Sequence, residues 1–344
     1  MAAIQHRLQI LRQRTRDLPF PRVFQDRSNP LETLSSPEMF QRYRFRPHSI
    51  LLLVNILFPY LERATGRSCP LPPLLSVLVS LHFLATGAHY IVVGDVHGIS
   101  ASSVCRAIKT TVAILSGVAR KKIQFRRDLD AVKAEFFSIA GFPNVIGLVD
   151  GTHIRINAPH QYEEDYVNRK GYHSINLQMV CDAGFRIQNV VVKWPGSVHD
   201  ARIFRQSSLC LDLENGVMDG YLLGDSGYAC RRYLLTPYLN TRSQAQERYN
   251  RALVKTRVII EQTYGVLKRR FPCLSYGLRV QPQRCCQIIL TCSFLHNFGL
   301  DNGDIFDRLD GFDVDQPDHD FHFQIQNPGN GLLFRDVLAQ TFFS

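Results

Sequence analysis

The stretch NVIGLVDGTHIRIN, which runs from Asn144 to Asn157, is an apolar segment that reaches a single carboxylate at Asp150. An apolar run of this kind predicts a central strand that is buried on both faces of a sheet. An acid at its end is costly unless it faces a cleft or binds a cation, although a strand-end acid can also cap the following turn. The stretch therefore predicts a sheet and marks Asp150 as a candidate functional residue.

Two further acids extend this pattern. Asp225 ends the run YLLGDSGY (Tyr221–Tyr228), and Glu261 lies within the helical pattern ALVKTRVIIEQTYGVLKRRF (Ala252–Phe271). A helix packed on the sheet would direct its acid toward the strand ends. Two strand-end acids and one helix acid are suited to holding two divalent metal ions, about 3.5–4 Å apart, for phosphodiester cleavage. Carboxylates are hard oxygen ligands, which favours Mg²⁺ or Mn²⁺.

A fourth acid, Asp200, lies in the sequence WPGSVHDARIF, where the chain leaves a predicted strand for a helix. Asp200 either completes the metal site or, with His199, occupies the first turn of that helix, where an acid favours the helix dipole. Asp165 and Asp182 lie in predicted hairpin turns and are interpreted as structural. We assign Asp150 as the ligand that both metal ions share.

The composition indicates which kind of partner the protein could bind and which cellular compartment it fits. The chain has 344 residues and a net charge of +10. This charge favours a polyanionic partner such as nucleic acid, although the protein could also be basic without binding one. Nine cysteines without CxxC pairs indicate neither a disulfide framework nor a zinc ribbon, and fit a reducing compartment. The apolar run Ile50–Tyr60 is too short to span a membrane, so no membrane association is expected.

The chain divides into four predicted segments. Residues 1–46 carry nine arginines against four acids and form a basic arm, which either touches phosphates or is a solvated helix face. Residues 47–142 are helical. Residues 143–300 form an α/β domain in which helices flank a mixed sheet. Residues 301–344 are acidic and predicted to be weakly ordered.

Within the helical segment, HYIVVGDVHGISASSVCRAIKTTVAILSGVARKK (His89–Lys122) predicts two helices around a tight turn at Gly98. Ser100 or Ser102 can cap the second helix. This is the pattern of a helix-turn-helix, whose second helix often lies in the DNA major groove, although such pieces also serve as plain packing units. The residues that would face DNA are Ser102, Ser103, Arg106 and Lys109.

A second basic stretch, NRKGYHS (Asn168–Ser174), precedes a predicted strand. Arg169 and Lys170 would hold a DNA backbone near the metal ions, or belong to an ordinary solvated turn. Three cations at the end of the Glu261 helix extend this surface or simply suit the helix C-terminus: Lys268, Arg269 and Arg270.

Six blocks of the chain resemble the PIF/Harbinger family of DDE transposases, and most closely the vertebrate nucleases derived from it. They are DGTHIRI, NRKGYHSINLQMVCD, WPGSVHD, LLGDSGY, IIEQTYGVLKRRF and CSFLHN, and they occur in the family's order within residues 75 to 300. The resemblance implies an RNase H-like catalytic domain behind a helix-turn-helix region. It also implies that Asp150, Asp225 and Glu261 form the metal-binding triad and that Asp200 is the fourth acid.

The same resemblance implies a Myb-like protein partner that assists DNA binding and nuclear entry, and hence a nuclear and cytoplasmic location. It further implies a domesticated protein that has lost transposition. The expected function is therefore a metal-dependent DNA nuclease. The alternative is a non-catalytic protein that binds DNA or recruits a partner on the same fold, while hydrolysis of small phosphate esters is disfavoured by the basic segments. A homo-oligomer is compatible with the sequence.

Overall fold

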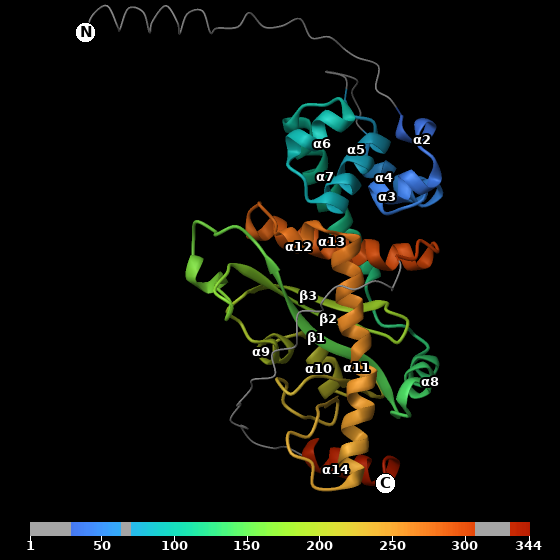
Figure 1. The fold of residues 1–344 in the computed structure, drawn as a ribbon, viewed down its shortest axis with the longest axis vertical. Coiled ribbons are helices and arrows are strands. Elements are labelled where there is room, and N and C mark those ends of the chain that lie inside the picture. Colours follow the sequence, from blue (N-terminus) through green and yellow to red (C-terminus); the bar gives the residue numbers. More distant parts are fainter. Residues whose placement is uncertain (1–28, 63–69, 307–330) are drawn as a thin grey trace, which may run out of the picture.

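The computed structural model describes residues 29–62, 70–306 and 331–344 (Figure 1). Most of the predicted basic arm, residues 1–28, and most acids of the predicted tail, within residues 307–330, lie outside the described residues. The division of the chain into four domains therefore stays a prediction.

One five-stranded mixed sheet forms the centre of the molecule, with the strand order β3-β2-β1-β4-β5. Strands β1 (Val145–Arg155), β2 (Ser174–Cys181) and β3 (Ile187–Pro195) pair in antiparallel fashion, whereas β4 (Tyr221–Leu223) and β5 (Leu234–Leu235) run parallel to β1. The predicted α/β class and mixed sheet are confirmed.

Strand β1 lies in the middle of this sheet because its first half is apolar, and Val145–Val149 is fully buried as the sequence predicts. Asp150, however, does not end the strand. Strand β2 pairs with β1 as far as Arg155, so β1 continues well past Asp150. The parallel partner β4 pairs with β1 only as far as Leu148. Asp150 therefore follows the end of the pairing on the β4 side, and only there does the prediction of a strand-end acid hold.

Helices cover both faces of the sheet. The 27-residue helix α11 (Gln244–Arg270) crosses one face and packs on β1, β2 and α8 (Leu129–Ala140), while α9 (Asp200–Arg205) packs on β2 and lies beside α10 (Ser208–Glu214) (Figure 1). The buried side chains form two hydrophobic clusters, one containing α8 and α11 and the other α9 and α10, and β1 contributes to both. Helices therefore pack against both faces of the sheet.

A helical region lies above the sheet in Figure 1. It begins with α2 (Pro30–Thr33), α3 (Ser36–Tyr43), α4 (Pro47–Leu61) and α5 (Pro73–Thr86). Helix α4 is largely apolar from Ile50 onward, and it continues through Pro59 before ending at Leu61. No single helix in the described ranges is long and apolar enough to cross a membrane; α6 (Tyr90–His97) and α7 (Ala101–Lys122), bent by 100°, meet that criterion only as a pair.

Helices α6 (Tyr90–His97) and α7 (Ala101–Lys122) form around the predicted turn. Gly98 ends α6 with a φ of 62°, a backbone conformation that glycine adopts without strain. The Ser100 hydroxyl accepts the Ser103 N–H and caps α7, as expected. The two helices and their turn are thus confirmed, while their use as a DNA-binding helix-turn-helix stays a prediction.

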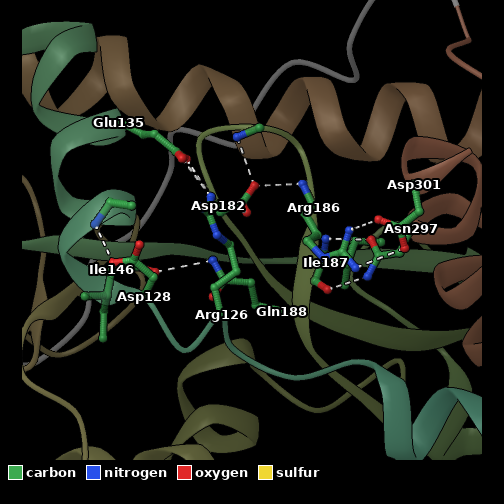
Figure 2. A network of polar contacts seen from close by, with 12 residues as sticks. Arg126, Asp128, Glu135, Ile146, Asp182, Arg186, Ile187, Gln188, Asn297 and Asp301 are labelled. Carbon is green, nitrogen blue, oxygen red and sulfur yellow. Dashed lines mark hydrogen bonds and ion pairs between the residues drawn. The ribbon is translucent and has the colours of Figure 1, made fainter. Parts of the chain in front are cut away.

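Helix α13 (Pro282–Asp301) joins the two regions, because it packs on both α7 and β3. Its Asn297 side chain accepts the Ile187 N–H at 2.9 Å and donates to the Ile187 carbonyl at 2.7 Å, so it pairs with edge strand β3 as a neighbouring strand would (Figure 2). The short elements η1 (Glu163–Tyr166) and α12 (Cys273–Tyr276) lie in connections.

The β2–β3 turn is organised by Asp182, which is buried and accepts the N–H groups of Gly184 and Arg186, each at 2.9 Å (Figure 2). Arg126 lies 3.7 Å from its carboxylate. The structural interpretation of Asp182 is confirmed. Asp165 lies in η1, within the β1–β2 connection, rather than in a hairpin turn.

The prediction of a weakly ordered tail is wrong for residues 331–344. Helix α14 (Gly331–Phe342) packs on α11, and the Phe343 ring lies tilted against Phe142 and edge-on to Tyr249. The Arg335 guanidinium lies 3.8 Å from the centre of the Tyr238 ring. The acidic average of the tail concealed this stretch, in which Leu338, Ala339 and Phe343 are buried.

We expect Asn297→Ala to lower the free energy of unfolding by about 2–4 kcal/mol, because it leaves both polar groups of Ile187 buried without partners. Asn302→Ala is the matched control: it removes a bond to the Phe298 carbonyl at the end of α13, where water can replace it, and should cost less than about 1 kcal/mol. Urea denaturation measures both. Equal losses would contradict the edge-strand role.

Candidate active site

The parallel pairing of β1 and β4 brings two of the predicted acids to one place. Leu148 of β1 pairs with Leu223 of β4, and Asp150 and Asp225 follow these two residues at the same offset. The Asp225 carboxylate accepts the Gly227 N–H at 3.0 Å, which fixes the turn after β4. The register therefore sets the two carboxylates side by side where β4 ends.

Helix α11 brings Glu261 to the β1 side of the site. The Tyr264 hydroxyl donates to the Asp150 carbonyl at 2.7 Å, and the Lys268 ammonium donates to the Thr152 hydroxyl at 3.0 Å. Glu261 lies less than one turn before Tyr264, on the same helix face. Its carboxylate forms no hydrogen bond or ion pair with other residues that the structure describes, so it is not neutralised there by a protein cation.

Asp200 approaches β1 from the start of α9. Asn176 donates to its carboxylate at 2.5 Å, and Gln178 donates to its carbonyl at 3.0 Å. A Cβ on Gly151 would lie 2.4 Å from the Asp200 carboxylate, so only glycine leaves room for this acid beside Asp150. Asp200 is therefore in the first turn of a helix, as one alternative predicted, and it also lies beside β1, while its role as a metal ligand stays a prediction.

The site accumulates negative charge in a poorly hydrated place. Burial raises the pKa of Asp150 to about 7; Arg257 opposes this shift, and the charges of Asp225 and Asp200 add to it. Burial also raises the pKa of Asp200 to about 6, against the hydrogen bond from Asn176. A carboxylate that is costly to ionise in this way is stabilised by a bound cation.

The side chains of the four acids do not converge on one point. Across residues 29–62, 70–306 and 331–344, no group of three or more His, Cys, Asp or Glu side chains converges closely enough to hold a metal ion. Each buried acid is instead held by a different protein partner. The donor chemistry and the surplus charge fit a hard divalent cation, whereas a closed ligand shell requires Glu261 and its neighbours to turn inward.

Arg257 is a site residue that the sequence analysis missed. Its guanidinium lies 3.6 Å from the Asp150 carboxylate, its side chain is only 14% exposed, and its Nε is buried without a hydrogen-bond partner among the described residues. It lies one helical turn before Glu261, on the same face of α11. That spacing is the sequence signal that could have identified it.

The predicted basic surface near the acids is partly assembled. Arg169 is exposed and close enough to lower the pKa of Asp200. Asn168, which is buried, accepts the backbone N–H of Lys170 at 2.9 Å and holds this turn in a fixed shape. Lys268 contacts β1 as described above, and Arg269 is half-buried.

Arg270 was predicted either to extend the same surface or to suit the C-terminus of its helix, and the surface alternative is wrong. Its side chain is 1% exposed, its guanidinium donates to the Asp304 carbonyl, and it lies 5.5 Å from the Phe45 ring centre. Burial lowers its pKa to about 10. Because α11 ends between the sheet and the helical region, its last residue points into the core instead of toward DNA.

The second predicted DNA surface lies on α7, in the helical region, on the far side of α13 from α9 (Figure 1). Ser102, Arg106 and Lys109 are exposed, whereas Ser103 is half-buried and occupied by the helix cap. The structure therefore does not bring these residues to the acids, and DNA contact by α7 stays a prediction.

A family profile described as "DDE superfamily endonuclease" matches residues 149–297, which contain all four predicted acids. The protein named "Putative nuclease HARBI1" from Mus musculus is 38% identical over 295 residues, covering 83% of this chain and 84% of its own length. The chain belongs to the Harbinger-derived DDE family. The Homo sapiens HARBI1 protein is also 38% identical, over 79% of this chain and 80% of its own.

A more distant member, "Protein ALP1-like" from Arabidopsis thaliana, is 28% identical over 72% of this chain and 65% of its own length. No solved structure matches the chain. The DDE endonuclease superfamily is RNase H-like and typically uses divalent metal ions, so the family and the mixed sheet together confirm the predicted fold.

We expect the metal-free protein to become more stable as the pH falls from 8 to 5. The folded pKa of Asp150 lies near 7, above its ordinary value of 3.8, so ionising this acid opposes folding and the cost is lost below the folded pKa. Asp150→Asn should therefore raise the free energy of unfolding at pH 8 by about 1–3 kcal/mol, with little difference from the wild type near pH 4.

Urea denaturation in the presence of EDTA measures this effect. The matched control is Asp130→Asn, because the Asp130 side chain is 97% exposed and should change stability little at either pH. An Asp150→Asn protein that is less stable than the wild type at pH 8 would contradict the interpretation.

Proposed function

We propose that this protein is a metal-dependent DNA nuclease of Harbinger transposase origin, which hydrolyses phosphodiester bonds and has no transposition activity. The observation that carries the proposal is the pairing of β1 with β4, which sets Asp150 and Asp225 side by side. The pKa of Asp150, raised to about 7, supports it, because acids placed this way favour a bound cation. Membership of the family supports it independently.

In this proposal Asp150 is the shared metal ligand, and Asp225, Glu261 and Asp200 complete the set. Bound Mg²⁺ or Mn²⁺ would neutralise the phosphate and activate the attacking water. Tyr264 fixes the β1 backbone at Asp150 from α11, so the strand and the helix that carry the ligands keep their spacing. Arg169, Lys268 and Arg257 supply positive charge around the scissile phosphate.

The other predicted partners extend the proposal. DNA is the substrate, and a Myb-like protein and a second copy of the chain are proposed partners. The proposed location is the nucleus and the cytoplasm. Contacts of Ser102, Ser103, Arg106 and Lys109 with DNA, and of Lys170 and Arg269 with the substrate backbone, belong to the same proposal.

A second candidate function is favoured by one observation. Arg257 already partners Asp150, and the described acids do not converge on a metal position. A protein that had abandoned catalysis could keep this arrangement as a stable core and use its basic surfaces to bind DNA or recruit a partner. The two functions differ in whether DNA is cut.

We expect the wild-type protein to nick supercoiled plasmid DNA in the presence of Mn²⁺. Asp150→Ala, Asp225→Ala and Glu261→Ala should each lower the rate about 100-fold or more, because each removes a proposed metal ligand. Agarose gel electrophoresis of the plasmid measures the rate. Asp130→Ala is the exposed control and should nick like the wild type. An inert wild type that still binds DNA would establish the second candidate instead.

We also expect Mn²⁺ to stabilise the folded protein in the absence of DNA. At a free concentration one hundred times Kd, one bound ion adds about 2.7 kcal/mol. The gain should be larger at pH 8 than at pH 6, because protons compete for Asp150, whose pKa is about 7. Thermal melts with and without EDTA measure it. Equal gains in the wild type and in Asp150→Asn would show that the ion binds elsewhere.

A further inference from the structure

A second feature lies near Asp200, on the outer part of the sheet. Trp194, the single tryptophan of the chain, is near the end of edge strand β3. The Lys193 ammonium lies 5.6 Å and the Arg202 guanidinium 6.0 Å from the centre of its ring. Lys193 and Arg202 are both exposed, and within the described ranges neither forms an ion pair. Two cations without acidic partners thus share one aromatic ring.

The indole ring is not part of the core. It is only partly buried and belongs to neither hydrophobic cluster, although the neighbouring residues Val190 and Val192 pack against the larger one. Its N–H is buried and has no hydrogen-bond partner in the described part of the chain. A large ring kept outside the core, with an unsatisfied donor, contributes less to folding than its size allows.

The sheet register fixes how far this ring lies from the acids. Trp194 pairs with Asn176 of β2, and the Asn176 side chain donates to the Asp200 carboxylate at 2.5 Å. Asn176 in turn pairs with His153 of β1, three residues beyond Asp150. Strand spacing and rise place the backbone of Trp194 roughly 14 Å from that of Asp150. Because side chains alternate along a strand, Trp194, Asn176 and His153 share the face of the sheet that Asp200 contacts, whereas the Asp150 side chain points to the other face. A nucleic-acid strand that passes Asp200 can therefore reach the ring within a few nucleotides.

The chemistry of the three side chains matches a single nucleic-acid strand. Exposed ammonium and guanidinium groups bind phosphates, and an aromatic ring stacks on any base that is not paired. Exposed cation–π contacts are worth only about 0.5–1 kcal/mol, so a phosphate can draw the two cations off the ring and leave its face to a base. If Trp194 served only to pack the sheet, the ring would be needed but the two cations beside it would have no role.

We propose that Lys193, Trp194 and Arg202 form a binding site for an unpaired nucleotide in the DNA strand that flanks the scissile phosphodiester. This inference rests on the proposed function, because it places the substrate strand across β3 and α9 next to Asp200. Arg169, which lies near Asp200, continues the positive charge from this site toward the acids.

Intrinsic fluorescence tests the site directly, because Trp194 is the only tryptophan. The probe is a DNA duplex with an unpaired single-stranded flank, titrated into the Asp150→Asn, Asp225→Asn protein without divalent metal, so that binding is measured without cleavage. We expect saturable quenching of Trp194 by the flanked duplex, and at least several-fold weaker quenching by a fully paired duplex. Equal quenching by both would overturn base stacking at this site.

Affinity for the same DNA, labelled and followed by fluorescence anisotropy, is expected to fall about 10-fold in Trp194→Leu and to be largely retained in Trp194→Phe. Arg202→Gln should weaken binding several-fold and reduce the salt dependence. Arg205→Gln is the matched control, because Arg205 is exposed on the same helix without touching the ring, and should bind nearly like the parent.

The surface variant Arg202→Gln keeps the inference testable if a Trp194 variant fails to fold. Unchanged DNA affinity in Arg202→Gln, with unchanged Trp194 emission, would overturn the site. The outcomes also separate this inference from the nuclease proposal. Plasmid nicking by wild type without Trp194 quenching would remove this site alone, whereas quenching by an inert wild type would keep the site and remove the nuclease.

Discussion

The position of the Asp150 carboxylate within a paired strand is the constraint on which the arrangement depends. Strand β1 pairs with β2 from Leu148 to Arg155, but it pairs with β4 only from Val145 to Leu148, so the carboxylate lies where one neighbour has ended and the other continues. Burial makes ionisation of this carboxylate unfavourable. The Arg257 guanidinium from α11, 3.6 Å away, offsets part of that cost. The neighbouring Gly151 lets a second acid approach, and the turn after β4 supplies a third.

Helix α13 holds the sheet and the helical region in one packed body. Its Asn297 pairs with Ile187 of edge strand β3 (Figure 2). Its His296 bonds the Phe185 carbonyl at 2.8 Å, and Arg270 at the end of α11 bonds the His296 carbonyl. The block CSFLHN, which carries part of the family resemblance, therefore has a structural role: its asparagine pairs the backbone groups of Ile187 on edge strand β3, which would otherwise be left without partners.

The sequence predicted the sheet, the α6–α7 turn and the hairpin at Asp182 because each depends on local chemistry: an apolar run, a glycine with its serine cap, and an aspartate that bonds its own turn. It failed where distant contacts decide. Asp150 is not at a strand end because β2 extends the strand, Arg270 is buried because α11 ends between two packed layers, and α14 is ordered because it packs on α11.

By itself, the sequence determined which residues could serve the site: acids after apolar runs, a glutamate on an amphipathic helix, and the order of blocks that marks the family. Only the tertiary structure decided their neighbours. Strand register set Asp150 beside Asp225, and helix packing put Arg257 against Asp150 and two cations over Trp194. The physical reason is that residue type fixes what a side chain can do, whereas burial, partners and charge come from segments far apart in the chain.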